Sequence, residues 1–263
     1  MKSRKRTVRV AVGVMLFWAF AVCAVWYLVF LLIPSIRHRG QTALHMAARE
    51  GELERLRFLL KMRMPVDIRN SAGQTGLHRA AYSGHMDCVR FLLAKGADPN
   101  AKDVSGAGPL LGAVREGHEA IAEVLVASGA FVDFMNCNGV TPLHCAAMIG
   151  KPGTVVLLLE HGANPNAADI NGGTPLHMAA EGCCADVVRL LLAAGAAPSV
   201  KDKNGKKPLH MAADDGRADV VAVLLAAGAD PRLKNRWGRT AADLARAKDH
   251  PDIAELLESA SSP

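Results

Sequence analysis

The chain has 263 residues, half of them apolar and 5% aromatic, and a formal net charge of +6. The positive charge belongs to one end: residues 1–39 hold seven Lys and Arg and no acid, whereas residues 40–263 hold 24 Lys and Arg against 25 Asp and Glu. A basic surface spread over a folded domain would indicate nucleic acid, so this distribution argues against a nucleic-acid partner.

An apolar segment follows the basic N-terminal tail of residues 1–9. Residues 10–33 contain neither a charge nor a proline. As a helix rising about 1.5 Å per residue they would extend about 36 Å, enough to cross a hydrocarbon core of about 30 Å. Pro34 ends the segment. The sequence therefore predicts a single transmembrane helix over 10–33, acting as a signal anchor, and a short linker over 34–39.

A cleaved signal peptide is the competing interpretation of this segment. The apolar region of a signal peptide is about 7–15 residues long, which is shorter than the run observed. Small residues occur at Ala19 and Ala21, but cleavage there would leave residues 22–33 as an exposed apolar stub. We therefore favour an uncleaved anchor, with a secreted product as the alternative.

The charges beside the segment bear on its orientation. Five basic residues precede it and two follow closely, so the positive-inside rule places the N-terminus in the cytoplasm and the rest of the chain on the outer, periplasmic or extracellular side. Further basic residues soon after position 48 reduce this asymmetry, and the unpaired cysteines favour a reducing compartment. The opposite orientation therefore stays open.

From residue 40 onward a glycine recurs every 33 residues. It begins seven units, at Gly40, Gly73, Gly106, Gly139, Gly172, Gly205 and Gly238. In the fifth unit, Thr174 is a good helix N-cap, Pro175 suits the first helical position, and Gly195 can end a second apolar helix. A single unit cannot bury both of its faces, but stacked neighbours can.

This pattern resembles the ankyrin repeat in its period, its T-P-L-H start and its L-L-L-x-x-G-A-[DN]-x-N close. The resemblance covers residues 40–263. It implies an all-α repeat solenoid of stacked helix-turn-helix units with hairpin-like loops, here preceded by the single transmembrane helix. We expect six full repeats, starting at residues 40, 73, 106, 139, 172 and 205, and a more polar C-terminal capping repeat from residue 238.

Five histidines recur three residues after the cap position: His45, His78, His144, His177 and His210. We interpret them as partners in capping boxes rather than as metal ligands. The third unit loses the hydroxyl and the imidazole together, at Gly108 and Leu111, and the last unit pairs Thr240 with Asp243. We therefore expect no metal site.

No catalytic motif is present. The chain contains no G-x-S-x-G, H-E-x-x-H or P-loop sequence. The six cysteines are irregularly spaced and include no C-x-x-C pair, which favours small buried hydrophobes over a zinc site or a disulfide framework. We expect a protein that is not an enzyme and has neither a cofactor nor a small-molecule substrate.

The ankyrin resemblance implies that partners dock on the concave side, which hairpin tips and first helices form. Apolar residues at such positions gather in the fourth and fifth units, with Tyr, Trp and Arg around them, as in a binding hot spot. The candidate partner-binding residues are Tyr82, Arg115, Val140, Met148, Ile149, Ile170, Trp237 and Arg239. The predicted function is a membrane-anchored scaffold or adaptor that binds another protein; the alternative is a secreted ankyrin effector or enzyme inhibitor.

Two units depart from the pattern between their helices. The fourth unit reads Gly150-Lys151-Pro152-Gly153, and the fifth reads Gly182-Cys183-Cys184 where the family has x-Gly-His. We expect locally altered loops at both places.

Overall fold

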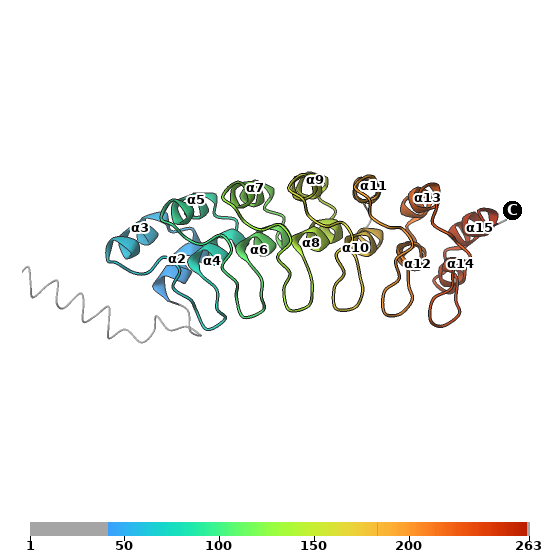
Figure 1. The fold of residues 1–263 in the computed structure, drawn as a ribbon, viewed down its shortest axis with the longest axis horizontal. Helices are drawn as coiled ribbons and strands as arrows, with labels where there is room; N and C mark the ends of the chain where they lie inside the picture. The colour runs from blue at the N-terminus through green and yellow to red at the C-terminus, as the bar shows by residue number, and fades with distance from the viewer. Residues whose placement is uncertain (1–41, 183, 262–263) are drawn as a thin grey trace, which may run out of the picture. The chain divides into compact units, whose positions relative to one another are not determined.

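The computed structural model describes residues 42–182 and 184–261, and within them the chain forms helices and loops without a β-strand (Figure 1). This part is an all-helical, solenoid-like stack, as predicted. The expected tail, transmembrane helix and linker, residues 1–39, lie outside the described residues. Within 42–182 and 184–261, no helix is both long and apolar enough to span a bilayer.

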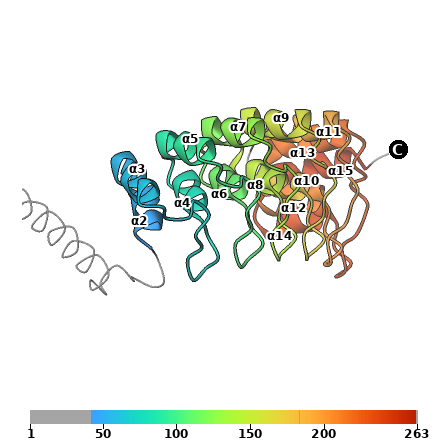
Figure 2. The ribbon, with the colours of Figure 1, turned by 60° about the vertical axis from the view of Figure 1, so that its left-hand side comes forward.

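The described helices form an inner and an outer layer, with hairpin-like loops projecting beyond the inner layer (Figures 1 and 2). The inner helices are α2 (Ala43–Glu50), α4 (Gly76–Tyr82), α6 (Pro109–Arg115), α8 (Pro142–Ile149), α10 (Pro175–Glu181), α12 (Pro208–Asp214) and α14 (Ala241–Ala247). The outer helices are α3 (Leu53–Lys61), α5 (Met86–Ala94), α7 (Glu119–Ala127), α9 (Pro152–Glu160), α11 (Ala185–Ala193), α13 (Ala218–Ala226) and α15 (Pro251–Ser259).

The inner helices are short because each begins at a strong N-terminal signal and ends before a glycine or polar turn. In α10, Thr174 caps the helix and Pro175 occupies its first turn, where the missing N–H costs no hydrogen bond. Ala179 and Ala180 are fully buried, and their small side chains let neighbouring inner helices approach. Helices α4 to α14 of the inner layer contact one another in chain order.

Leucines fill the space between the two layers. Burying one leucine side chain stabilises a fold by about 1.5–3 kcal/mol, so the repeated positions supply a continuous core. The largest fully buried side chains are Leu44, Leu56, Leu59, Leu77, Leu92, Leu125, Leu143, Leu158, Leu176, Leu191, Leu224 and Leu257.

The expected capping boxes are present at Thr75, Thr141, Thr174 and Thr240, and the histidines also bond to the next unit. In α8 the backbone N–H of Thr141 donates to Nδ1 of His144 (3.2 Å), while Nε2 of His144 donates to the Gly173 carbonyl (3.1 Å). Equivalent contacts to a carbonyl 29 residues ahead are made by His45, His78, His177 and His210.

Each hairpin is held by a turn at its base and by its neighbour at its tip. Oδ1 of Asp169 accepts hydrogen bonds from the backbone N–H groups of Asn171 and Gly173, both at 2.8 Å. At the tip, the N–H of Ile170 donates to the Asn138 carbonyl of the preceding hairpin (2.9 Å). The tips therefore form a connected row.

The glycine that starts the fourth unit is required by this packing. Gly139 has a φ of 74°, and a Cβ placed on it would lie 3.0 Å from the Cα of Asp169 in the next hairpin. Any larger residue would be strained in conformation and would push the two hairpins apart.

The altered loop expected in the fourth unit is not observed. Gly150 has a φ of 67°, close to the 81° of Gly84 and the 77° of Gly117 at the same position in other units. Lys151 is the N-cap of α9, and Pro152 begins it. Proline is tolerated in the first turn of a helix, so the loop is ordinary. The altered loop predicted for the fifth unit includes Cys183, which lies outside the described residues.

Candidate protein-binding surface

Two rows of side chains, each repeating every 33 residues, form a surface that we call the hairpin–helix face. The helix row lies at the C-terminal ends of the inner helices: Arg49, Tyr82, Arg115, Met148, Glu181 and Asp214. The hairpin row lies at the tips: Ser71, Val104, Cys137, Ile170, Lys203 and Arg236. All of these residues are exposed except Asp214, which is half-buried.

Three of the predicted site residues are consecutive members of the helix row. The Tyr82 side chain is 38% exposed and that of Met148 is 46% exposed, and Arg115 stands between them in sequence register. The Arg115 guanidinium lies over the Tyr82 ring, 5.4 Å from its centroid. Gly112 presents no side chain beside Tyr82, since a Cβ there would lie 3.8 Å from the Tyr82 Cβ.

The other predicted residues of the fourth and fifth units differ in how far their side chains are exposed. Ile170 is 50% exposed at the tip of its hairpin. Val140, in the preceding hairpin, and Ile149, the last residue of α8, are both half-buried. Ile170 and Met148 therefore offer most of the accessible apolar surface in this region.

Trp237 and Arg239 lie in the last described hairpin, two units further along than Ile170. The Trp237 side chain is 54% exposed, and the Arg236 guanidinium lies 4.5 Å from the centroid of its ring. Arg239 is exposed. This pair belongs to the far end of the hairpin–helix face rather than to the surroundings of Met148.

The charges of the face differ between its two ends. In the sixth unit, Lys206 of the hairpin and Asp214 of α12 form a half-buried ion pair with an N–O distance of 2.7 Å. Burial and the nearby Asp215 carboxylate raise the pKa of Glu181, against the effect of Lys206. Acids thus end α10 and α12, whereas arginines stand at the equivalent positions of α2 and α6.

The described cysteines match the interpretation as small hydrophobes in part. Cys88 and Cys145 are buried, whereas Cys137 is exposed at a hairpin tip. Burial raises the pKa of the Cys145 thiol to about 11. At neutral pH this thiol is protonated and therefore a poor nucleophile.

A second exposed apolar feature, away from the predicted residues, lies in the loop after α7. Phe131 and Met135 are 59% and 54% exposed. Phe131 meets Phe134 edge to face with their ring centroids 5.1 Å apart, and Nζ of Lys102 lies 4.0 Å from the centroid of the Phe134 ring.

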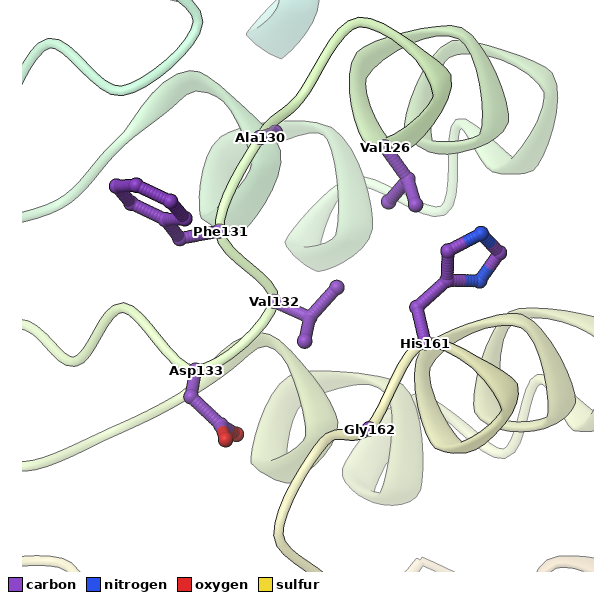
Figure 3. Close-up of a pocket in the computed structure, with 7 residues that line it drawn as sticks. All are labelled: Val126, Ala130, Phe131, Val132, Asp133, His161 and Gly162. Carbon is purple, nitrogen blue, oxygen red and sulfur yellow. The ribbon is translucent and has the colours of Figure 1, made fainter.

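This loop borders a cavity of about 360 Å³ between the ends of α7 and α9. Figure 3 shows Val126, Val132 and His161 directed toward a common space, whereas the Phe131 ring points away from them. The lining residues are Val126, Ala130, Phe131, Val132, Asp133, His161 and Gly162.

The sequence carried a signal for this loop. The third unit reads Phe-Val-Asp-Phe-Met over 131–135, where the second unit has Asp-Pro-Asn-Ala-Lys over 98–102 and the fourth has Asn-Pro-Asn-Ala-Ala over 164–168. An apolar replacement of a polar, repeated segment could have been noticed by comparing the units position by position.

A family model described as ankyrin repeats (3 copies) matches residues 18–103, 110–202 and 185–262. Among solved structures, the crystal structure of the human ASB11 ankyrin repeat domain is similar at 30% sequence identity. The match has a TM-score of 0.77 and covers 85% of this chain and 99% of that one. No curated protein matches the chain significantly. Together with the stacked helix pairs, these matches show that the chain belongs to the ankyrin-repeat family.

Proposed function

We propose that the chain is a membrane-anchored scaffold or adaptor that binds a partner protein on its hairpin–helix face. Ankyrin repeats are typically non-enzymatic modules that bind other proteins, which supports the class of function. The proposed array has six full repeats and a C-terminal cap from residue 238. The fold alone does not select a partner, so partner choice depends on the exposed side chains.

The observation that carries the proposal is the exposed run of the helix row at Tyr82, Arg115 and Met148. Tyr and Arg are enriched at binding hot spots, and methionine adapts its shape to an apolar partner. Arg115 is already ordered over the Tyr82 ring at 5.4 Å, so less side-chain entropy is lost when a partner covers it. Ile170 extends the apolar surface to the hairpins.

A charge introduced into this run tests the partner-binding role. The variant Met148→Glu should abolish co-purification of the partner that the wild-type full-length chain captures, because it replaces an apolar contact with a charged group that the partner must desolvate. The matched control is Arg189→Glu on the exposed side of α11, far from the helix row in sequence register. Capture of the same amount of partner by the Met148→Glu and Arg189→Glu variants, measured by quantitative mass spectrometry, would refute the assignment of the face.

The membrane part of the proposal rests on the uncharged segment 10–33, with the repeats on the outer side. Deletion of residues 10–33 should move the chain from an alkaline-extracted membrane pellet into the supernatant. The mature mass of the intact chain separates the alternatives. A loss of about 2–3 kDa, as expected for a signal of about 15–30 residues, would favour the secreted effector or inhibitor.

A further inference from the structure

Three arginines lie around one tyrosine at the N-terminal end of the hairpin–helix face. Arg49 is near the end of α2, Arg79 is in the middle of α4, and Arg115 is the last residue of α6. Tyr82 is the last residue of α4, and the Arg115 guanidinium lies over its ring. Arg49 is close enough to Arg79 for its charge to lower the Arg79 pKa, although burial is the larger cause.

These charges are poorly neutralised. Among residues 42–182 and 184–261, neither Arg49 nor Arg79 forms an ion pair, and Arg115 has only an exposed contact of 3.4 Å with the adjacent Glu116. One Nη of Arg79 approaches Oε1 of Gln74 at 3.4 Å, and the Nε atom of Arg79 is buried with no hydrogen-bond partner in the described part of the chain.

The other half of the face shows that this arrangement is not a general feature of the repeats. Helices α2, α4 and α6 together contain three arginines and one acid, Glu50, whereas α10 and α12 contain no Lys or Arg and end in Glu181 and Asp214. There the basic hairpin residue Lys206 is paired with Asp214 at 2.7 Å. The repeats as a whole are nearly neutral, so the excess positive charge is local.

We propose that Arg49, Arg79, Arg115 and Tyr82 form an arginine subsite that binds an Asp- or Glu-rich segment of the partner protein. A half-buried guanidinium without a counter-ion carries a desolvation cost that an incoming carboxylate offsets. The planar guanidinium also matches a carboxylate in a two-bond geometry. The inference rests on the proposed partner-binding function and specifies the chemistry of the partner.

Tyr82 gives the subsite an apolar component. Its ring is 38% exposed, and the glycine at position 112 leaves the space beside it open. An apolar side chain within the acidic segment can pack on this ring while the flanking carboxylates meet the arginines. The expected ligand is therefore an acidic peptide with an interspersed Leu, Phe or Met rather than a uniform run of acids.

A random peptide library displayed on phage and selected on the full-length chain in non-ionic detergent tests this inference. The enriched peptides are expected to carry a clear excess of Asp and Glu together with an apolar residue. Binding of the most enriched peptide, measured by fluorescence anisotropy, should weaken with added salt, because screening acts on exposed charges.

Single substitutions then locate the contact. Arg49→Gln, Arg79→Gln and Arg115→Gln should each weaken the selected peptide about tenfold, as expected for loss of one charged contact. Arg115→Lys keeps the positive charge but loses the two-bond geometry of the planar guanidinium, so it should retain part of the affinity. Arg189→Gln, an exposed position on α11 outside the hairpin–helix face, is the matched control and should leave the affinity unchanged. Circular dichroism confirms that each variant is folded.

The outcomes separate the inference from the proposed function. Enriched peptides that are neutral or basic, or acidic peptides that bind the arginine variants as tightly as wild type, would overturn the arginine subsite. If those peptides nevertheless bound the Met148→Glu variant more weakly than the wild-type chain, partner binding on the face would stand. If no peptide were enriched over a bait-free surface, the arginine subsite would fail, while partner capture, measured independently by co-purification, would still decide the function.

Discussion

The buried histidines each join two units. Nδ1 of His177 accepts from the Thr174 N–H (3.1 Å), and Nε2 donates to the Lys206 carbonyl (3.3 Å). We expect His177→Ala to leave both backbone groups unpaired and to lower the free energy of unfolding by about 2–4 kcal/mol. Urea denaturation measures the change. His161→Ala, an exposed histidine at the end of α9, is the control and should have little effect; equal losses would contradict the role of His177.

The same histidines predict how stability depends on pH. Burial lowers the pKa of all five below the usual 6.5, to about 4 for His210. The unfolded chain therefore binds more protons than the folded chain below about pH 6.5. The stability that these residues contribute is complete above that pH and is lost as the pH falls toward their folded pKa values.

We expect the free energy of unfolding to be lower at pH 5 than at pH 7.5 by at least about 2 kcal/mol. Urea denaturation at both values measures the difference. His177→Gln removes one of the titrating groups and should reduce the slope. A stability that is constant between these two values would contradict the proposed neutral, buried state of the histidines.

The loops after the outer helices carry an asparagine at one repeated position in two units and an aspartate in the unit between them. Nδ2 of Asn100 donates to the Gly129 carbonyl (2.8 Å), and Nδ2 of Asn166 donates to the Gly195 carbonyl (2.9 Å). Asp133 occupies the equivalent position and accepts from the Asn164 N–H (3.0 Å), but a carboxylate has no proton to donate to the Gly162 carbonyl. The cavity beside α7 lies at this junction.

Asp133→Asn should therefore supply the missing bond and raise the free energy of unfolding by about 1 kcal/mol. The reciprocal change Asn166→Asp should lower it by a similar amount at the matched junction. Thermal and urea unfolding measure both variants. If the two substitutions had the same sign, the amide would not be the stabilising group.

Several departures from the repeat pattern coincide between the third and fourth units of the array. Leu111 replaces the histidine that would bond to the next hairpin, Gly108 replaces the capping threonine, and Asp133 replaces the donating asparagine. In a repeat array each unit is stabilised by its neighbours, so this junction is expected to open before the others inside the array.

Native-state hydrogen exchange tests this expectation. The amides of α6 to α9 should exchange faster than those of α10 to α13, and the variant Gly108→Thr/Leu111→His should restore their protection. Uniform exchange rates along both segments in the wild-type chain would contradict it.

The repeat fold could be predicted because the caps, glycines and apolar runs are local signals that recur at a constant spacing. The bond from each histidine to the next unit could not, because it depends on the register between stacked helices. Pro152 suggested an altered loop, but the first turn of a helix accepts proline and Gly150 supplies the left-handed conformation. For the candidate face, sequence register located exposed residues such as Met148, whereas Val140 and Ile149 proved half-buried because neighbouring elements cover them.

Site-specific photo-crosslinking in cells shows whether a partner protein occupies the hairpin–helix face. A photoreactive amino acid replaces Met148 or Ile170 on the face, and Arg189 on α11 in the control. We expect a discrete crosslinked protein from the first two positions and none from the third. Crosslinks only from position 189, or equally from all three, would rule out partner binding on this face.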